Sequence, residues 1–184
     1  MSRIGNAPIS LPKGVELQVS DKNLVTAKGP KGELHQEINP AIKVAVQEGQ
    51  VLLTRSTEQK QHRALHGLYR ALINNMVKGV SEGYNIELEL VGVGYRATAK
   101  GQLLELSLGY SHNVAFELPK EVKFETKAER GQTPRILLAS HDKQLLGQVV
   151  AKITSLRKPE PYKGKGIKVI GRQYRRKAGK TASK

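Results

Sequence analysis

The sequence repeats itself at a spacing of 80 residues, and this repeat limits the possible folds more than any other feature. With that shift, Gly29 aligns with Gly109 and Gly67 with Gly147. Apolar positions also align: Leu24 with Leu104, Leu34 with Val114, Ile38 with Leu118, Ile42 with Val122, Val44 with Phe124, Ile73 with Ile153 and, after a short insertion, residues 51–53 with 136–138. Because this period exceeds that of a solenoid, each copy is expected to be a domain with its own core.

The first copy is expected to contain short strands followed by one helix. Apolar and polar residues alternate over 15–19, which is the period of a half-buried strand. Ser56 is the expected N-cap of a helix that Gly79 ends. Further strands are expected over 24–27, 42–46 and 51–54, with a turn at Lys28-Gly29-Pro30-Lys31-Gly32.

The second copy repeats this order. Residues 86–90 and 104–108 alternate as strands, and Ser140 can cap a helix that must end by Lys158 because Pro159 follows. Runs of strands closed by a single helix predict an α+β fold, in which each tandem domain is an antiparallel sheet with one helix packed on it. The expected division is an N-terminal α+β domain over 1–82, a C-terminal α+β domain over 83–170, and a basic tail over 171–184.

The charge of the chain indicates a polyanionic partner. The 31 Lys and Arg outnumber the 16 Asp and Glu, giving a formal net charge of +15. Residues 152–184 hold 12 of the basic residues and one acidic residue, so the excess is concentrated in one segment. Cysteine is absent, which excludes disulfides and thiolate chemistry. No apolar run approaches a membrane span or a signal peptide, so we expect an intracellular protein with no membrane partner.

Three motifs resemble a nucleotide-binding, a phosphate-binding and a zinc site, but each lacks an element that its chemistry requires. Gly92-Val93-Gly94-Tyr95-Arg96-Ala97 matches a dinucleotide fingerprint, but another strand follows it where a helix is required, so a hairpin is expected. Residues 178–181 resemble the end of a phosphate-binding loop without its first glycine. His62 and His66 lack the glutamate of a zinc protease and are expected at the surface or facing a partner. We therefore expect no catalytic residue, no metal ligand, no cofactor and no small-molecule substrate.

The segment that favours nucleic acid lies between Pro159 and Lys168. Pro159 and Pro161 stiffen the exit from the helix, and Tyr162 offers a ring for stacking. Glycines that alternate with lysines would let the backbone approach a phosphate surface closely. The candidate binding residues are Tyr162, Lys163, Gly164, Lys165, Gly166 and Lys168, followed in the tail by Arg172, Tyr174, Arg175, Arg176, Lys177 and Lys180.

The whole chain resembles the ribosomal protein L6 family of the bacterial large subunit. The resemblance rests on Ser2-Arg3-Ile4-Gly5 with Ile9 and Pro12, on the turn at 28–32, on 92–97, on Leu108-Gly109-Tyr110-Ser111-His112 and, most specifically, on 159–167. It implies a two-domain α+β protein formed by duplication, without catalytic activity or cofactor.

The resemblance also implies a place for the protein. Such a protein sits in cytoplasmic ribosomes, contacts neighbouring ribosomal proteins and binds large-subunit (23S) rRNA near the stalk base and the translation-factor docking region. The contacts would lie at 162–168 and after Gly171, with Lys158, Gly92, Gly94, Tyr95 and Arg96 as further candidates. From the residues alone, two alternatives remain open: a protein-docking module with an electrostatic tether, and a protein that compacts DNA without sequence preference.

Overall fold

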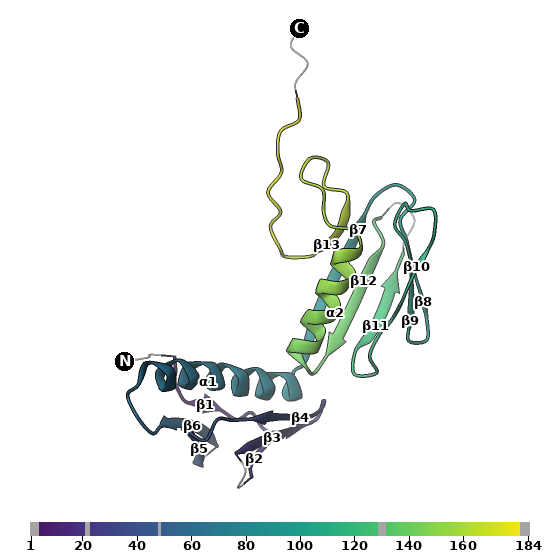
Figure 1. The fold of residues 1–184 in the computed structure, drawn as a ribbon. Helices are drawn as coiled ribbons and strands as arrows, with labels where there is room; N and C mark the ends of the chain where they lie inside the picture. The colour runs from purple at the N-terminus through teal and green to yellow at the C-terminus, as the bar shows by residue number, and fades with distance from the viewer. Residues whose placement is uncertain (1–3, 21–22, 48, 129–131, 181–184) are drawn as a thin grey trace. The chain divides into compact units, whose positions relative to one another are not determined.

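The computed structural model describes residues 4–20, 23–47, 49–128 and 132–180 (Figure 1). The chain forms two compact units, one of residues 1–84 with 141–143 and one of residues 85–140 with 144–184. Ser2 and Arg3 of the opening motif and residues 181–184 of the tail lie outside the described residues.

The first unit contains two antiparallel sheets and one long helix. One sheet has the order β1(Ile9–Ser10)-β6(Gln50–Arg55)-β5(Ile42–Gln47), and the other has β2(Glu16–Val19)-β3(Leu24–Gly29)-β4(Gly32–Glu37). Helix α1(Lys60–Ser81) packs against β3, β4 and β6. Ile73 and Val80 of the helix are fully buried against Val25 and Ile42 of the sheets, which places the core between helix and strands.

The second unit has the same plan with one additional strand. One sheet has the order β8(Arg96–Lys100)-β9(Leu103–Ser107)-β10(Val114–Glu117). The other has β11(Lys123–Lys127)-β12(Arg135–Ser140)-β7(Tyr84–Val91)-β13(Gly166–Val169), and α2(Lys143–Leu156) lies across it (Figure 1). Leu146 and Ile153 of α2 are fully buried, as are Leu90, Leu138 and Ile167 of the sheet.

The expected α+β class and the tandem duplication are confirmed, with two small sheets in each copy. Identical backbone contacts recur at matching positions. Ile38 N–H donates to Asn23 O at 3.0 Å in the first copy, and Leu118 N–H donates to Gln102 O at 2.9 Å in the second. The turns before β2 and β8 also match, because Gly14 and Gly94 have φ of 85° and 76°.

One proposed pairing within the repeat is wrong by a single residue. Leu24 is 38% exposed, whereas its expected partner Leu104 is fully buried. In the first copy the buried residues of β3 are Val25 and Ala27, so Val25 is the structural equivalent of Leu104. The two faces of a strand alternate with period two, so a shift of one residue exchanges the core face for the solvent face.

Both expected helix starts and one helix end are corrected. Helix α1 begins at Lys60, after Gln59 rather than Ser56, and α2 begins at Lys143, after Ser140 has ended β12. Gly79 lies inside α1 and is buried. The helix ends at Ser81, and Gly83, with φ of 75°, donates to Lys78 O at 3.1 Å. Gly83 is therefore the residue that allows the left-handed turn after the helix.

His66 is buried, so its expected position at the surface is wrong. Only 1% of its surface is exposed, and Nε2 lies 3.0 Å from Leu53 O while Nδ1 lies 3.0 Å from an Arg55 guanidinium nitrogen. A carbonyl only accepts and a guanidinium only donates, so the two contacts suit a ring that donates from Nε2 and accepts at Nδ1. The position matches Leu146 of the second copy, where an apolar residue fills the same site.

Candidate nucleic-acid interface

The segment after α2 is a closed hairpin rather than an open loop. Glu160 N–H donates to Lys165 O at 2.7 Å, and Ile167 N–H donates to Arg157 O at 2.9 Å. From Gly166 the chain forms β13, which pairs with β7 so that Gly166 lies opposite Val91. Ile167 of this strand is fully buried and anchors the hairpin to the core. We refer to residues 159–168 as the basic hairpin.

The predicted binding side chains of the basic hairpin are displayed on its outside. Tyr162 is 51% exposed, and Lys163 and Lys165 are exposed beside it. Lys168 is half-buried on β13, and Lys158 is exposed where α2 gives way to the hairpin. Four cations and one aromatic ring are thus gathered here around a single carboxylate, Glu160, which is the composition of a nucleic-acid contact.

Glycine is needed at two positions of the basic hairpin, 164 and 166, for different structural reasons. A Cβ on Gly166 would lie 2.6 Å from Lys158 O and 2.8 Å from Pro159 Cα, so the chain's own backbone requires glycine there. A Cβ on Gly164 would meet only side-chain ends, with Lys168 Nζ at 2.9 Å and an Arg176 nitrogen at 3.3 Å. Gly164 also has φ of 72°, which L-residues rarely adopt. Gly166 thus supports the fold of the hairpin, whereas Gly164 lies beneath Lys168 of the hairpin and Arg176 of the tail.

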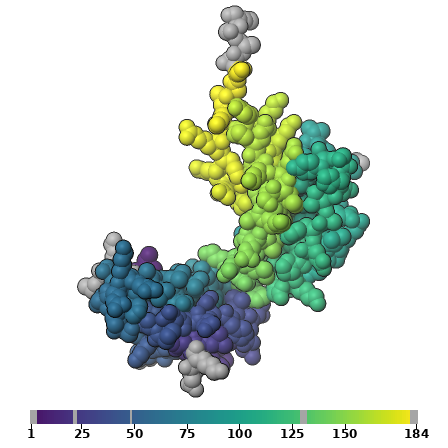
Figure 2. Space-filling view, viewed as in Figure 1, coloured from purple at the N-terminus to yellow at the C-terminus, as the bar shows by residue number. Residues whose placement is uncertain are grey.

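The first part of the tail folds back onto the basic hairpin. Val169 N–H donates to the Tyr174 hydroxyl at 2.9 Å, and Lys177 N–H donates to Pro161 O at 2.8 Å. The Arg172 guanidinium lies 5.8 Å from the centroid of the Tyr174 ring. Arg175, Arg176 and Lys180 remain exposed, and Figure 2 shows this segment on the surface of the second unit. Tail and hairpin therefore present their cations as one surface.

The turn at residues 92–96 lies beside the basic hairpin, because Val91 is the register partner of Gly166. It is not the expected hairpin, since β7 and β8 on its two sides belong to different sheets. Arg96 is exposed and Val93 is 91% exposed, whereas Tyr95 is only 7% exposed. A Cβ on Gly92 would lie 2.7 Å from the Tyr95 ring, so this glycine makes room for the ring.

The sequence interpretation gave no role to Tyr110, His112 or Arg157, which the structure adds to this end of the unit. The Arg157 guanidinium lies 4.9 Å from the centroid of the Tyr110 ring. The Tyr110 hydroxyl donates to Leu156 O at 3.1 Å, at the end of α2. Hydrogen bonding to Tyr110, followed by interactions with Tyr95, raises the pKa of Arg157, whose guanidinium is cationic at any working pH. The motif at 108–112 was the one available sequence signal.

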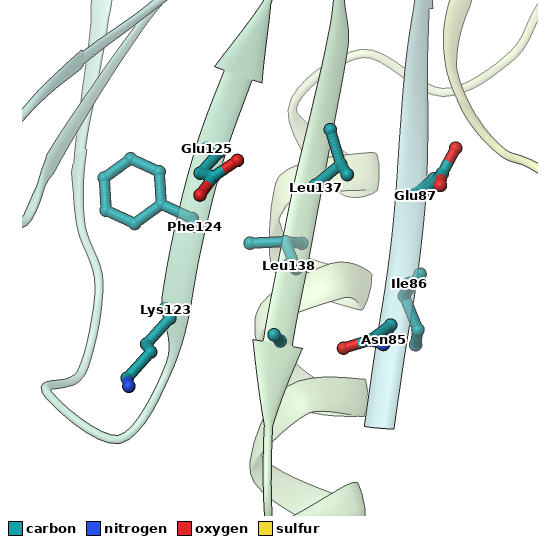
Figure 3. Close-up of a pocket in the computed structure, with 9 residues that line it drawn as sticks. Asn85, Ile86, Glu87, Lys123, Phe124, Glu125, Leu137 and Leu138 are labelled. Atoms are coloured by element: carbon teal, nitrogen blue, oxygen red, sulfur yellow. The ribbon is translucent and has the colours of Figure 1, made fainter. Parts of the chain in front are cut away.

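A hollow on the β11-β12-β7 sheet has the wrong charge for a nucleic-acid partner. Figure 3 shows it on the face of the sheet away from α2, with Leu137 in the middle. Glu87 and Glu125 flank it against the single cation Lys123, and the remaining lining residues are Asn85, Ile86, Phe124, Leu138 and Ala139. Two carboxylates against one ammonium repel phosphate, so the hollow is no part of a polyanion site.

Among the described residues, no group of three or more His, Cys, Asp or Glu could hold a metal ion. In the same part of the chain, no helix is long and apolar enough to cross a membrane.

Comparison with known proteins identifies a family. The family model described as ribosomal protein L6 matches residues 11–83 and again 91–169. The chain is 65% identical over 184 residues to a protein named large ribosomal subunit protein uL6 from Parabacteroides distasonis, covering 100% of both chains. It is 61% identical to the uL6 of Cytophaga hutchinsonii, again over 100% of both. Identity to the uL6 of Bacteroides fragilis is 60%, covering 99% of this chain and 98% of that protein.

Proposed function

The chain belongs to the ribosomal protein L6 family, and on this premise we propose that its C-terminal part binds and braces large-subunit rRNA. It is a structural, non-enzymatic component of the large ribosomal subunit and therefore of the cytoplasmic ribosome. The proposal concerns the contact surface, which consists of the basic hairpin and of tail residues 171–180. The location near the stalk base follows from the family resemblance.

One observation supports the proposal most directly. The tail is hydrogen-bonded to the basic hairpin through Tyr174 and Lys177, so cations from two segments are held on one surface. A disordered tether would not need these bonds. Phosphate contacts fix a protein's register on RNA, and a surface held in one shape can match one arrangement of phosphates.

The candidate residues divide into three roles. Lys163, Lys165, Arg175, Arg176 and Lys180 are exposed and would contact phosphates, with Lys158, Lys168, Arg172, Lys177 and Arg96 at the margins. Tyr162 would stack on a base or a ribose. Gly164, Gly166, Gly92, Gly94, Tyr95 and Tyr174 would act by holding the surface in shape. We propose 1–82, 83–170 and 171–184 as the functional division of the chain.

Competition binding tests the proposal. The full chain is titrated with large-subunit rRNA in the presence of arbitrary duplex DNA, and contacts are then mapped by crosslinking on assembled subunits. We expect folded rRNA to remain bound in the presence of a large excess of duplex DNA. The crosslinks should lie at the basic hairpin and the tail. Equal affinity for both polyanions would favour the DNA-compacting alternative. Crosslinks only to protein would favour the docking module.

A further inference from the structure

We propose that Tyr110 and His112 form a stacking platform for one unpaired nucleobase of the bound RNA. The inference rests on the proposed function, because it assumes that RNA reaches this end of the second unit. It goes further by assigning a base contact, which phosphate attraction alone does not require.

The two rings are already stacked on each other. Their centroids lie 5.8 Å apart and their planes differ by 14°, which is an offset parallel arrangement. Neither ring is part of the core, since Tyr110 is 43% exposed and His112 is exposed. An exposed aromatic pair gains little from burial within its own chain, so its arrangement suits a partner with a flat ring.

The platform is held in place before any partner arrives. The Tyr110 hydroxyl donates to Leu156 O, and the Arg157 guanidinium lies against the Tyr110 ring. Gly109, with φ of 75°, places the loop against the buried Tyr95 ring, to which an added Cβ would lie 3.4 Å away. A platform fixed in this way loses little conformational freedom on binding.

The surroundings of the platform favour RNA over a protein partner. Residues 108–113 contain no acidic side chain, and Arg157 supplies positive charge beside them. Asn113, next to His112, lines a polar hollow with Gly94, Arg96 and Ser107. The one carboxylate of that hollow, Glu105, is paired with Lys100 at 2.9 Å. A base on the rings would therefore have donors for its phosphate within the same surface.

Two probes of equal charge separate stacking from phosphate attraction. The full chain is titrated with short oligoadenylate and with an abasic ribose-phosphate strand of the same length. We expect His112→Ala to weaken oligoadenylate binding about tenfold, the effect of one lost base stack, and to leave the abasic strand unaffected. His112→Tyr keeps an aromatic ring and should restore binding of oligoadenylate. His35→Ala, at an exposed histidine of β4, is the matched control and should change neither affinity.

Proton NMR of the His112 ring gives a direct signal. Oligoadenylate should move its resonances upfield, as a stacked base does, whereas the abasic strand should not. Equal affinity of His112→Ala and the parent for oligoadenylate would overturn the platform, even while both strands still bind through the tail. Binding of neither strand by the parent would overturn the proposed function, and the platform would fall with it.

Discussion

The backbone N–H of Val169 donates to the side-chain hydroxyl of Tyr174 at 2.9 Å, so the tail is fastened to the last strand of the sheet. The contact turns a stretch of charge into a surface of defined shape. It also makes the tail's contribution testable apart from its charge.

Tyr174→Phe should loosen the tail without changing any charge. The Val169 N–H loses its acceptor, a contact worth about 1 kcal/mol, and its amide hydrogen exchange should accelerate by roughly fivefold. Affinity for rRNA should fall while its dependence on salt stays the same. Tyr162→Phe is the control, because Tyr162 is exposed on the hairpin and its loss of a hydroxyl leaves the Val169 bond intact. Unchanged exchange at Val169 in Tyr174→Phe would contradict the anchoring role.

Two truncations should have different effects on salt dependence. Ending the chain after Lys177 keeps the bond to Pro161 O and most tail cations, whereas ending it after Gly171 removes both. Affinity of the parent should fall on the order of 10³–10⁵ between about 50 and 200 mM salt if roughly 6–10 cations contact phosphates. The longer deletion should flatten the slope of log affinity against log salt far more than the shorter. If neither deletion changes the slope, the tail does not contact rRNA phosphates.

Gly166→Ala should lower the free energy of unfolding by more than Gly164→Ala. The Cβ at 166 overlaps Lys158 O, a backbone atom that cannot move alone, whereas the Cβ at 164 meets flexible side-chain ends. We expect a loss of about 1–2 kcal/mol for Gly164→Ala from its positive φ. The loss should be larger for Gly166→Ala, because its φ is also positive, at 133°, and the overlap with the backbone disrupts the β13 pairing. Denaturant unfolding measures both. Gly179→Ala, where nothing lies within 4 Å, is the control.

These glycines also limit the choice of variants that can test the contact between the basic hairpin and RNA. A double Gly164 and Gly166 variant would confuse a misfolded hairpin with a lost RNA contact. Lys163→Ala with Lys165→Ala avoids the problem, because both side chains are exposed. This pair should weaken binding to every polyanion by a similar factor, with unchanged unfolding. Selective loss of rRNA binding alone would indicate that these lysines recognise shape as well as charge.

His66→Leu should destabilise the first unit less than His66→Ala. Leucine fills the space as Leu146 does in the second copy, although Leu53 O and Arg55 lose a partner, at about 1–3 kcal/mol. Alanine loses the same bonds and also leaves a cavity, adding roughly 2 kcal/mol. Thermal unfolding of the full chain distinguishes them. Equal midpoints for the two variants would show that the ring's volume contributes nothing.

Several parts of the fold and the site were accessible from the sequence because they depend on local patterns. The 80-residue repeat, the strand alternation and the apolar helix face follow from side-chain periodicity, and they predicted the α+β class. The charge of 152–184 depends only on composition, and it predicted a polyanionic partner, which agrees with membership of a ribosomal protein family. Helix ends were less accessible, since Ser56 and Gly79 have the right chemistry for caps but lie at the wrong positions.

Only the tertiary structure decided which residues of the site face outward and which support it. Ile167 and Leu90 are register partners on β13 and β7, although they lie far apart in the sequence, and this pairing makes residues 166–169 a strand. The same long-range packing buries Tyr95 and His66, exposes Tyr110 and His112, and folds the tail onto the hairpin. Such outcomes depend on contacts between distant segments. A short window of sequence fixes the period of its side chains. The free energy that decides which distant segment packs against that window comes from the surface that the two segments bury together.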